Sequence, residues 1–162
     1  MKSGVGDSPH PRSDFAMAYD SHTDKVVLFG GNVDPSGAGG PEYTLADTWF
    51  YDYTTNKWKE MKPKVSPHGR IGHSMVYDKN IKRIVLFGGL DGYQFFNDVW
   101  IYDVNTNTWE QIAINSSMGP SPRAYAAMEF DPIRKRILLQ GGLVYEQEGV
   151  HGDFWEFIIT SR

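Results

Sequence analysis

Hydrophobic and polar positions along the chain form a unit that occurs three times. Each unit opens with a short, mostly apolar segment that ends in or next to Asp, at 15–20, 73–78 and 126–131. A polar turn leads to an aliphatic run closed by two glycines, at 26–31, 84–89 and 137–142. The third segment starts with Asp and has Trp two positions later, at 47–51, 98–102 and 153–157. Short apolar runs bounded by turn residues predict strands, and a repeat of roughly 50 residues is typical of stacked β-units.

A fourth strand is predicted in the first two units only. The polar turns at 54–56 and 105–107 lead into segments that carry Trp58 and Trp109. The equivalent Trp of the third unit would fall two positions beyond Arg162, and residues 1–10 contain no strand-like run that could replace it. We therefore expect eleven strands, here called a to d in each unit, with strand d of the third unit missing. The continuous apolarity of strand b, as at 84–87, predicts a strand covered on both faces.

An Arg precedes strand a in every unit, as Arg12, Arg70 and Arg123. The order Arg, strand, Gly-Gly, Asp-x-Trp, turn, Trp resembles the kelch repeat. The resemblance implies an all-β fold, a partial β-propeller of three four-stranded kelch blades with the last blade incomplete. Its units are a flexible segment at 1–10 and blades at 11–62, 63–113 and 114–162. Propellers typically have 4–8 blades, so we expect either a piece of a longer propeller or a half-ring completed by another chain.

The repeated glycines and tryptophans are expected to be structural. The glycine pairs would turn the backbone where strand b ends, and the indoles would lie between blades with each N–H bonded to a backbone acceptor. A phosphate-binding loop would need a following helix N-terminus, and none is predicted. Phe15, Val85 and Trp100 are expected to be buried. The structural set is Gly30, Gly31, Gly88, Gly89, Gly141, Gly142, Trp49, Trp58, Trp100, Trp109 and Trp155.

Composition narrows the class of protein. The formal net charge is −4 and no run of basic residues is present, which argues against nucleic-acid binding. No apolar stretch reaches the roughly 20 residues of a membrane span, and the N-terminus lacks the apolar core of a signal peptide. Cysteine is absent, which excludes disulfides and thiolate metal sites in this chain. We expect no cofactor and no metal. The compartment stays open, with the cytoplasm favoured.

Binding is expected at the loops, because loops on a rigid scaffold can vary without disturbing the core. In kelch propellers the d–a and b–c loops meet on one face, the usual surface for partners. Here the b–c loops are 32–46, 90–97 and 143–152, and their lengths differ. We expect a protein or peptide partner with an acidic or phosphorylated group opposite the arginines. The candidate binding residues are Arg12, Arg70, Arg123, His68, Tyr43, Tyr93, Phe95 and Tyr145.

The repeated arginines and the histidines each have a second interpretation. The arginines either grip a ligand's carboxylate or phosphate, or bond backbone carbonyls and a neighbouring Asp and so stabilise the blades. His10 and His68 share a column with Ser121, but no third ligand column accompanies them, so a metal is not expected. His73 on strand a is expected to be a hydrogen-bonded structural residue. In the aromatic loop after Gly89, Phe96 is expected to tuck against the next blade.

Three classes of function fit the pattern. A non-catalytic interaction module needs only a rigid face and variable loops. A self-assembling half-propeller would pair its open edges with a second copy and form a six-bladed ring by homodimerisation. A fragment of a sugar-processing propeller enzyme is the third class, although no nearby pair of acid and base candidates supports it.

Overall fold

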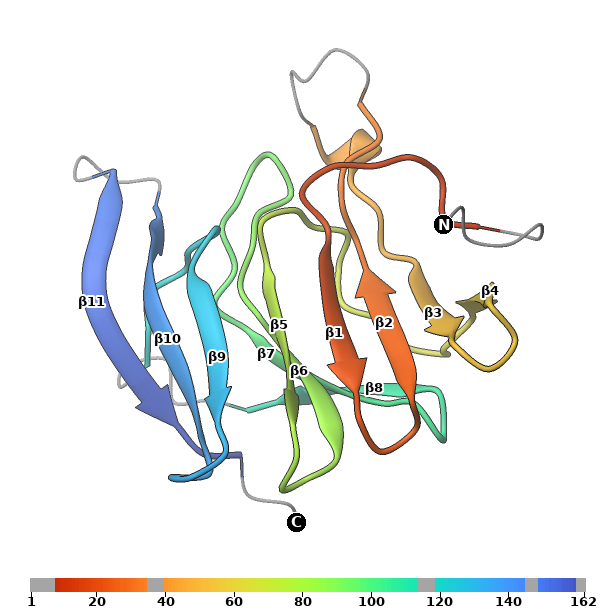
Figure 1. The fold of residues 1–162 in the computed structure, drawn as a ribbon. Helices are drawn as coiled ribbons and strands as arrows, with labels where there is room; N and C mark the ends of the chain where they lie inside the picture. Colours follow the sequence, from red (N-terminus) through yellow and green to blue (C-terminus); the bar gives the residue numbers. More distant parts are fainter. Residues whose placement is uncertain (1–7, 35–39, 114–118, 145–148, 160–162) are drawn as a thin grey trace.

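Eleven strands form three antiparallel sheets in the computed structural model, which describes residues 8–34, 40–113, 119–144 and 149–159 (Figure 1). Sheet 1 contains β1 (Ala16–Asp20), β2 (Lys25–Phe29), β3 (Thr48–Asp52) and β4 (Lys57–Met61). Sheet 2 contains β5 (Ser74–Asp78), β6 (Arg83–Phe87), β7 (Val99–Asp103) and β8 (Thr108–Ile112). Sheet 3 contains β9 (Ala127–Asp131), β10 (Arg136–Leu143) and β11 (Val150–Phe157). One short 3₁₀ turn, η1 (Pro41–Tyr43), lies between β2 and β3.

The all-β prediction and the order of the strands are confirmed. In the described residues the third sheet has strands a, b and c and no strand d. Val85 is fully buried as expected, but Phe15 is 38% exposed, because its side of sheet 1 has no neighbouring sheet in the described residues. Each predicted unit holds one sheet, and the boundaries between the units stay predictions. Residues 1–7, most of the predicted flexible segment, lie outside the described residues.

The hairpin turns explain the Asp at the end of strands a and c. The Asp52 carboxylate accepts hydrogen bonds from the backbone N–H groups of Thr54 and Thr55, at 2.8 and 3.3 Å. Asn56 then adopts a positive φ of 55°, a conformation that Asn tolerates better than most residues. The same pairing of a carboxylate with a left-handed residue four positions later recurs in the other hairpins, at Asp20, Asp78, Asp103 and Asp131.

Two apolar clusters lie between the sheets. The first joins sheet 1 to sheet 2 and includes Val27, Phe29, Leu86 and Trp109. The second joins sheet 2 to sheet 3 and includes Val85, Phe87 and Leu139. The innermost strands also follow one another, since β1 contacts β5 and β5 contacts β9. Sheet 2 is therefore covered on both faces, as the apolarity of its strand b predicts.

Sheet 3 departs from the repeat at its glycine pair. In sheets 1 and 2 strand b ends before the glycines, but β10 continues through Gly141 and Gly142 to Leu143. A register shift between Gln140 and Gly142 lets β10 stay paired with β11, which begins early at Val150. The prediction that strand b ends at the glycines is wrong for this sheet. The predicted b–c loop at 143–152 is correspondingly shorter, because both of its ends are strand.

The predicted binding loops share one end of the molecule. Figure 1 shows the described parts of the loop after β2, the loop after β6, the end of β10 and the start of β11 at the top, where β1, β5 and β9 also begin. The a–b turns lie at the opposite end. No helix in the described ranges is long and apolar enough to cross a membrane.

Candidate functional site at the loop end

Each repeated Arg is bonded to its own sheet through its side chain. Arg70 makes a bidentate ion pair with Asp98, with Nη1–Oδ1 and Nη2–Oδ2 distances of 2.6 and 2.9 Å. Its Nη1 also donates to the Gly88 carbonyl at 2.8 Å and its Nε to the His68 carbonyl at 3.0 Å. The guanidinium thereby joins the entry of strand a to the end of strand b and the start of strand c.

The same arrangement occurs in all three sheets. Arg12 pairs with Asp47 and the Gly30 carbonyl, and Arg123 pairs with Asp153 and the Gly141 carbonyl. The Asp also accepts the indole N–H of the Trp two positions on, at 2.6 Å for Trp49, 2.7 Å for Trp100 and 2.5 Å for Trp155. The expectation of backbone acceptors is wrong for these three indoles, because the adjacent carboxylate lies within reach.

These carboxylates are held ionised. Burial by itself would raise the pKa of Asp98, but the hydrogen bonds and charge of Arg70, with the bond from Trp100, outweigh burial and lower it. The same balance lowers the pKa of Asp47, and the bond from Arg123 lowers the pKa of Asp153 most strongly. An ionised carboxylate whose two oxygens are both occupied is poorly suited to act as a general acid.

The geometry favours the structural interpretation of the arginines. Arg70 and Arg123 are each 1% exposed, and the Arg12 side chain is buried as well. Their guanidinium groups are already matched by a carboxylate and by backbone carbonyls. The expectation that they reach a partner's acidic group finds no support here, since a ligand would first have to break a buried ion pair.

The Arg backbone bonds to the preceding sheet. The Arg70 carbonyl accepts the Gly31 N–H at 3.0 Å, and the Arg123 carbonyl accepts the Gly89 N–H at 2.8 Å. Gly30 and Gly88, the first glycines of the first two pairs, make room for this contact, because a Cβ on Gly30 would lie 2.7 Å from the Arg70 carbonyl oxygen and one on Gly88 would lie 2.6 Å from that of Arg123. Arg70 and Arg123 thus each contact their own sheet through the side chain and the preceding sheet through the main-chain carbonyl. The sheet-stabilising role of the glycine pairs follows from this close approach and from their positive φ.

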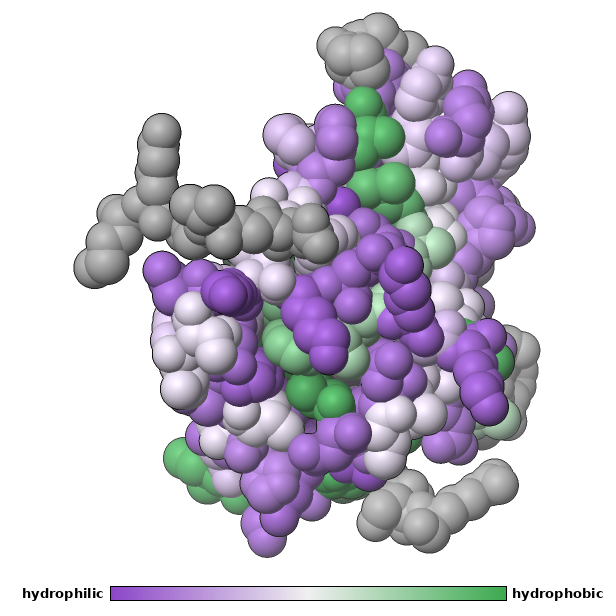
Figure 2. Space-filling view, turned by 90° about the vertical axis from the view of Figure 1, so that its right-hand side faces the viewer, coloured by the Kyte–Doolittle hydropathy of each residue, from purple (hydrophilic) through white to green (hydrophobic). Residues whose placement is uncertain are grey.

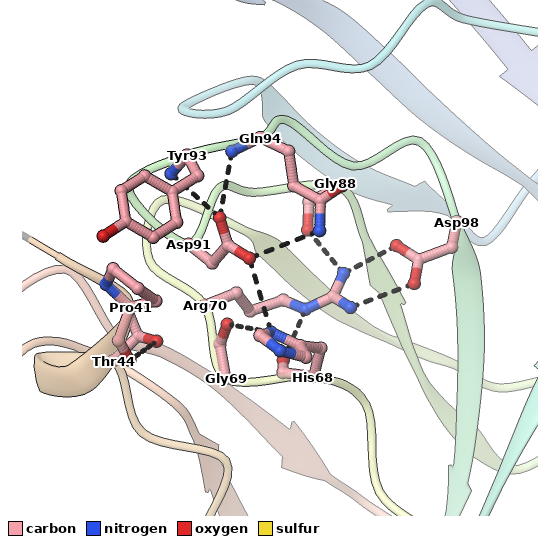
Figure 3. Close-up of polar contacts among 10 residues, drawn as sticks. All are labelled: Pro41, Thr44, His68, Gly69, Arg70, Gly88, Asp91, Tyr93, Gln94 and Asp98. Atoms are coloured by element: carbon pink, nitrogen blue, oxygen red, sulfur yellow. Dashed lines mark hydrogen bonds and ion pairs between the residues drawn. The ribbon is translucent and has the colours of Figure 1, made fainter.

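Asp91 organises the loop that follows β6, as Figure 3 shows. Its side chain accepts the backbone N–H groups of Tyr93 and Gln94 at 3.0 and 2.9 Å, and the Gln94 amide at 3.3 Å. Asp91 is 4% exposed, whereas Tyr93 is 75% exposed. A buried carboxylate therefore fixes the turn from which Tyr93 projects. The Asp-Gly pair at 91–92 was the available signal for this turn.

His68 lies beside this loop. Its Nδ1 is 3.6 Å from Asp91 Oδ2 and 3.0 Å from the Gly69 carbonyl oxygen. The centroids of the His68 and Phe96 rings are 5.9 Å apart. The Arg70 guanidinium carbon lies 4.2 Å from the centroid of the Phe96 ring. The Phe96 carbonyl accepts the Arg123 N–H at 3.0 Å, so its backbone contacts the next blade while its ring packs on its own. Asp91 therefore contacts both the His68 ring and the backbone of Tyr93.

The loops of sheets 1 and 2 are in direct contact. A Cβ on Gly69 would lie 2.9 Å from the Thr44 carbonyl oxygen, and one on Gly92 would lie 3.0 Å from the Gly40 Cα. Tyr43 is partly exposed on the adjacent loop, and Phe95 is half-buried. Tyr145 lies outside the described residues. Four of the aromatic and histidine candidates therefore belong to one neighbourhood, that of Asp91 and the loop before β3.

A second feature at this end was missed from the sequence. Asp14, Gly72 and Tyr125 occupy one column, two residues after each Arg, and all have a positive φ. The Gly72 N–H donates to the Asp14 carbonyl at 3.0 Å and the Tyr125 N–H to the Gly72 carbonyl at 2.6 Å. The Tyr125 hydroxyl reaches the Asp14 carboxylate at 3.4 Å across Gly72. The signal was the position of the column, innermost in each unit, rather than any shared residue type.

The histidine column does not assemble into a metal site. The His10 ring bonds the Pro11 carbonyl, and the Ser121 hydroxyl bonds His151 at 3.1 Å. Within the described ranges no group of three His, Asp or Glu side chains is placed to hold a metal ion. His73 is buried, and neither of its ring nitrogens makes a hydrogen bond of standard geometry with the described residues.

Comparison with known proteins identifies the repeat. The chain matches the model of the KLHDC2/KLHL20/DRC7 kelch-repeats domain over residues 2–162. It is 29% identical over 152 residues to the flagellar outer-arm dynein alpha chain of Chlamydomonas reinhardtii, which is 93% of this chain and 3% of that protein. It is 36% identical over 99 residues to Mei4-dependent protein 6 of Schizosaccharomyces pombe, 57% of this chain and 14% of that protein.

A third relative is a probable serine/threonine-protein kinase of Dictyostelium discoideum, 32% identical over 142 residues, or 85% of this chain and 10% of the kinase. The chain therefore spans a small part of the length of each of these relatives. Domains of this kind are generally non-catalytic protein-interaction modules. With its three sheets and its repeated Arg–Asp–Trp contacts, the chain belongs to the kelch-repeat family and has the fold of a partial kelch β-propeller.

Proposed function

We propose that this chain binds a protein or peptide partner through the loop end of sheets 1 and 2. The observation that carries the proposal is the contrast between Asp91 and Tyr93. A buried carboxylate holds the loop by three hydrogen bonds, and the tyrosine that follows is three-quarters exposed. A large aromatic side chain on an ordered loop can be buried by a partner at little cost in conformational entropy.

The surface around Tyr93 supplies further contacts. His68 offers an exposed ring on the other side of Asp91, and Tyr43 lies on the neighbouring loop. The partner would insert apolar atoms beside Tyr93 and place a hydrogen-bond acceptor opposite His68. An acidic or phosphorylated group of the partner would serve only as this acceptor opposite His68. It would not pair with Arg70 or Arg123, because both are buried and already paired.

An enzymatic function gains no comparable support. Three carboxylates at the loop end, Asp47, Asp98 and Asp153, are each bonded to an Arg and to a Trp. Asp91 is bonded to the backbone of its own loop. These carboxylates are held in a structural role. The interaction module is therefore the proposal.

Paired variants test the binding surface. Tyr93→Ala removes the exposed aromatic at the loop end, and Ile133→Ala removes an apolar side chain of similar exposure from a turn at the opposite end. We expect Tyr93→Ala to weaken partner capture from the source cell by about tenfold or more, as for an interface hot spot, with an unchanged fold. Quantitative mass spectrometry of co-purified proteins, followed by titration of the purified partner, measures the loss. Equal recovery with both variants would refute the loop-end surface.

A further inference from the structure

Asp14, Gly72 and Tyr125, here called the inner rim, form one line across the three sheets at the loop end. Each lies two residues after a repeated Arg and two residues before the innermost strand of its sheet, β1, β5 or β9. Two backbone hydrogen bonds join them in order, from the Gly72 N–H to Asp14 and from the Tyr125 N–H to Gly72. The inner rim is therefore a continuous edge to which every sheet contributes one residue.

Tyr125 keeps a bulky side chain at a position that suits glycine. All three residues of the inner rim have a positive φ, 54° at Asp14, 60° at Gly72 and 58° at Tyr125. Glycine takes this conformation without steric cost and Asp tolerates it, but a residue as large as tyrosine rarely adopts it. Strained positions of this kind gather at functional sites, so the side chain of Tyr125 calls for an explanation beyond the fold.

The Tyr125 ring crosses sheet 2 to reach sheet 1. It lies directly on Gly72, where an added Cβ atom would be 2.9 Å from two of the ring carbons. Its hydroxyl is 3.4 Å from Asp14 Oδ1. Burial, with the charge of Asp14, raises the pKa of Tyr125, so the hydroxyl stays protonated. The residue is still 51% exposed. An exposed carboxylate beside an exposed aromatic ring is a suitable site for a cation.

The Asp14 carboxylate takes part in no ion pair within the part of the chain that the structure describes. Its two oxygens accept the hydroxyls of Ser13 and Tyr125, at 2.8 and 3.4 Å. The three repeated arginines of the loop end are each matched by an Asp of their own sheet. The inner rim therefore has a negative charge that these arginines do not compensate.

The lysines of sheet 1 are placed away from the inner rim. Lys57 and Lys59 lie on β4, the edge strand opposite β1. Figure 2 views the molecule from this outer side and shows a surface that is mostly hydrophilic, with smaller hydrophobic patches. Lys25 lies at the turn end of β2 and pairs with Asp52. Charge is thus divided within sheet 1, with the lysines at the outer edge and the turn end and Asp14 at the inner rim.

The inner rim adjoins the loop that carries Tyr93. Ile71 and Leu90 form a bridge with N–O distances of 2.8 and 3.0 Å. Ile71 directly precedes Gly72, and Leu90 directly precedes the loop that begins at Asp91. The bridge holds the two features together at one end of sheet 2, so a segment bound at Tyr93 can extend to the inner rim.

We propose that the inner rim binds a positively charged side chain, arginine or lysine, of the protein segment that binds at the loop end. The inference rests on the proposed function and adds the charge of the partner. The cationic group pairs with Asp14 and lies against the Tyr125 ring. Arginine is the better match, because its planar guanidinium stacks on aromatic rings and donates two parallel bonds to a carboxylate.

Peptide pools test the charge of the partner. Acetylated hexapeptide amides on beads carry arginine, citrulline or glutamate at the third position and mixtures of neutral residues elsewhere. Citrulline keeps the shape of arginine without its charge. We expect the arginine pool to retain about threefold more of the unchanged chain than the citrulline pool, as for an exposed ion pair with a cation–π contact, and the glutamate pool to retain least. Equal retention by the arginine and citrulline pools would overturn the proposal.

Asp14→Asn and Asp24→Asn are a matched pair of variants. Each removes one negative charge from an exposed Asp that has a positive φ and accepts a tyrosine hydroxyl, but Asp24 lies in a turn at the opposite end. Asp14→Asn should bring retention by the arginine and citrulline pools close to equality, whereas Asp24→Asn should leave their ratio unchanged. An equal fall of the ratio in both variants would mean that net charge alone attracts the peptides, and the proposal would be lost.

Tyr125→Gly tests the ring. Glycine fits the positive φ of this position, as at Gly72, so we expect the variant to fold, and its urea midpoint checks this. The ratio between the arginine and citrulline pools should fall. A folded Tyr125→Gly protein with an unchanged ratio would overturn the contact between the cation and the ring.

Partner capture separates this inference from the proposed function. Asp14→Asn should weaken the capture measured with Tyr93→Ala, while Asp24→Asn should not. Capture that depends on Tyr93 but not on Asp14 would overturn the cation site and leave the loop-end surface standing. A preference for arginine that depends on Asp14, with capture unaffected by Tyr93→Ala, would support the cation site and refute the proposed function alone.

Discussion

A Cβ atom on Gly88 would lie 2.6 Å from the carbonyl oxygen of Arg123, so sheets 2 and 3 approach each other at a point that only glycine fits. Gly141 is its equivalent in sheet 3 and has nearly the same φ, +66° against +67°. Its nearest contact for a Cβ is the His151 carbonyl oxygen at 3.0 Å, within the same sheet. A comparison of substitutions at Gly88 and Gly141 therefore separates the free-energy cost of a side chain at positive φ from the cost of a clash between sheets.

Gly88→Ala should be more destabilising than Gly141→Ala. Both variants place a side chain at a positive φ, which costs about 1–2 kcal/mol. Gly88→Ala adds a clash with backbone atoms of the next sheet, worth about a further 1–3 kcal/mol. Urea denaturation followed by tryptophan fluorescence measures both. Similar losses for the two variants would show that the carbonyl of Arg123 can move away.

Arg70→Ala should unfold the protein more readily rather than act on binding alone. The substitution leaves Asp98 and the Gly88 carbonyl without their donor in a buried site, a change that costs about 3–5 kcal/mol. Arg134→Ala is the control, because Arg134 pairs with Asp131 at the surface and should leave the midpoint nearly unchanged. A stable Arg70→Ala protein with weakened partner binding would instead restore the arginine to the binding surface.

Stability should fall as the pH drops from about 6.5, because of His73. Burial, with the nearby charge of Arg70, lowers the pKa of His73 to about 3. The unfolded chain takes up a proton on this ring near pH 6.5, while the folded chain keeps it neutral. The unfolded state therefore binds more protons between pH 6.5 and 3, and the free energy of unfolding falls by at most about 1.4 kcal/mol per pH unit.

The control for this pH dependence is His73→Ala, which introduces the residue that sheet 3 has in the same column, Ala126. Its free energy of unfolding will be lower at neutral pH, since a buried ring is lost. Its slope between pH 6.5 and 4.5 should be smaller than that of the unchanged protein. Parallel curves would mean that His73 is not the group that responds.

Most of the fold was predictable because its signals are local and repeated. Strand order, hairpin turns and the buried Val85 follow from apolar runs, from Asp at strand ends and from the spacing of the Trp columns. The extension of β10 through Gly141 and Gly142 was not predictable, because it depends on pairing with β11 rather than on the glycines. The exposure of Phe15 also depends on a neighbour, since the same column is buried in sheet 2 as His73.

The placement of the candidate residues in the loops was predictable from the sequence, but their contacts were not. The repeated Arg attracted a ligand interpretation, yet its partner Asp98 lies 28 residues away and only the folded backbone brings the two together. Asp91 and Tyr93, by contrast, are close in sequence, and what the sequence could not show is that one is buried while the other projects. Which charged side chains pair across strands, and which side chains are buried or exposed, both depend on how the folded sheets pack.

Trp109 and Trp58 occupy the same column but should contribute unequally to stability. Trp109 is buried between sheets 1 and 2, with its ring 5.2 Å from Phe29 and its N–H bonded to Thr48 Oγ1 at 3.0 Å. Trp58 is half-buried and packs on Tyr51 of its own sheet. We expect Trp109→Ala to lower the free energy of unfolding by about 3–5 kcal/mol, and Trp58→Ala by clearly less.

Circular dichroism in urea is the suitable measurement for these two variants, because each removes a fluorophore. The bond between sheets is isolated by a double-mutant cycle of Trp109→Phe and Thr48→Val, which keeps a ring and a side chain of similar shape at the two positions. The N–H of Trp109 and the hydroxyl of Thr48 are partners in a buried site, so losing either leaves the other unpaired. The two substitutions should therefore be less costly together than the sum of their separate effects, by about 1 kcal/mol. Additive losses would show that the apolar contact of Trp109 with Phe29, and not the hydrogen bond to Thr48, holds sheets 1 and 2 together at this point.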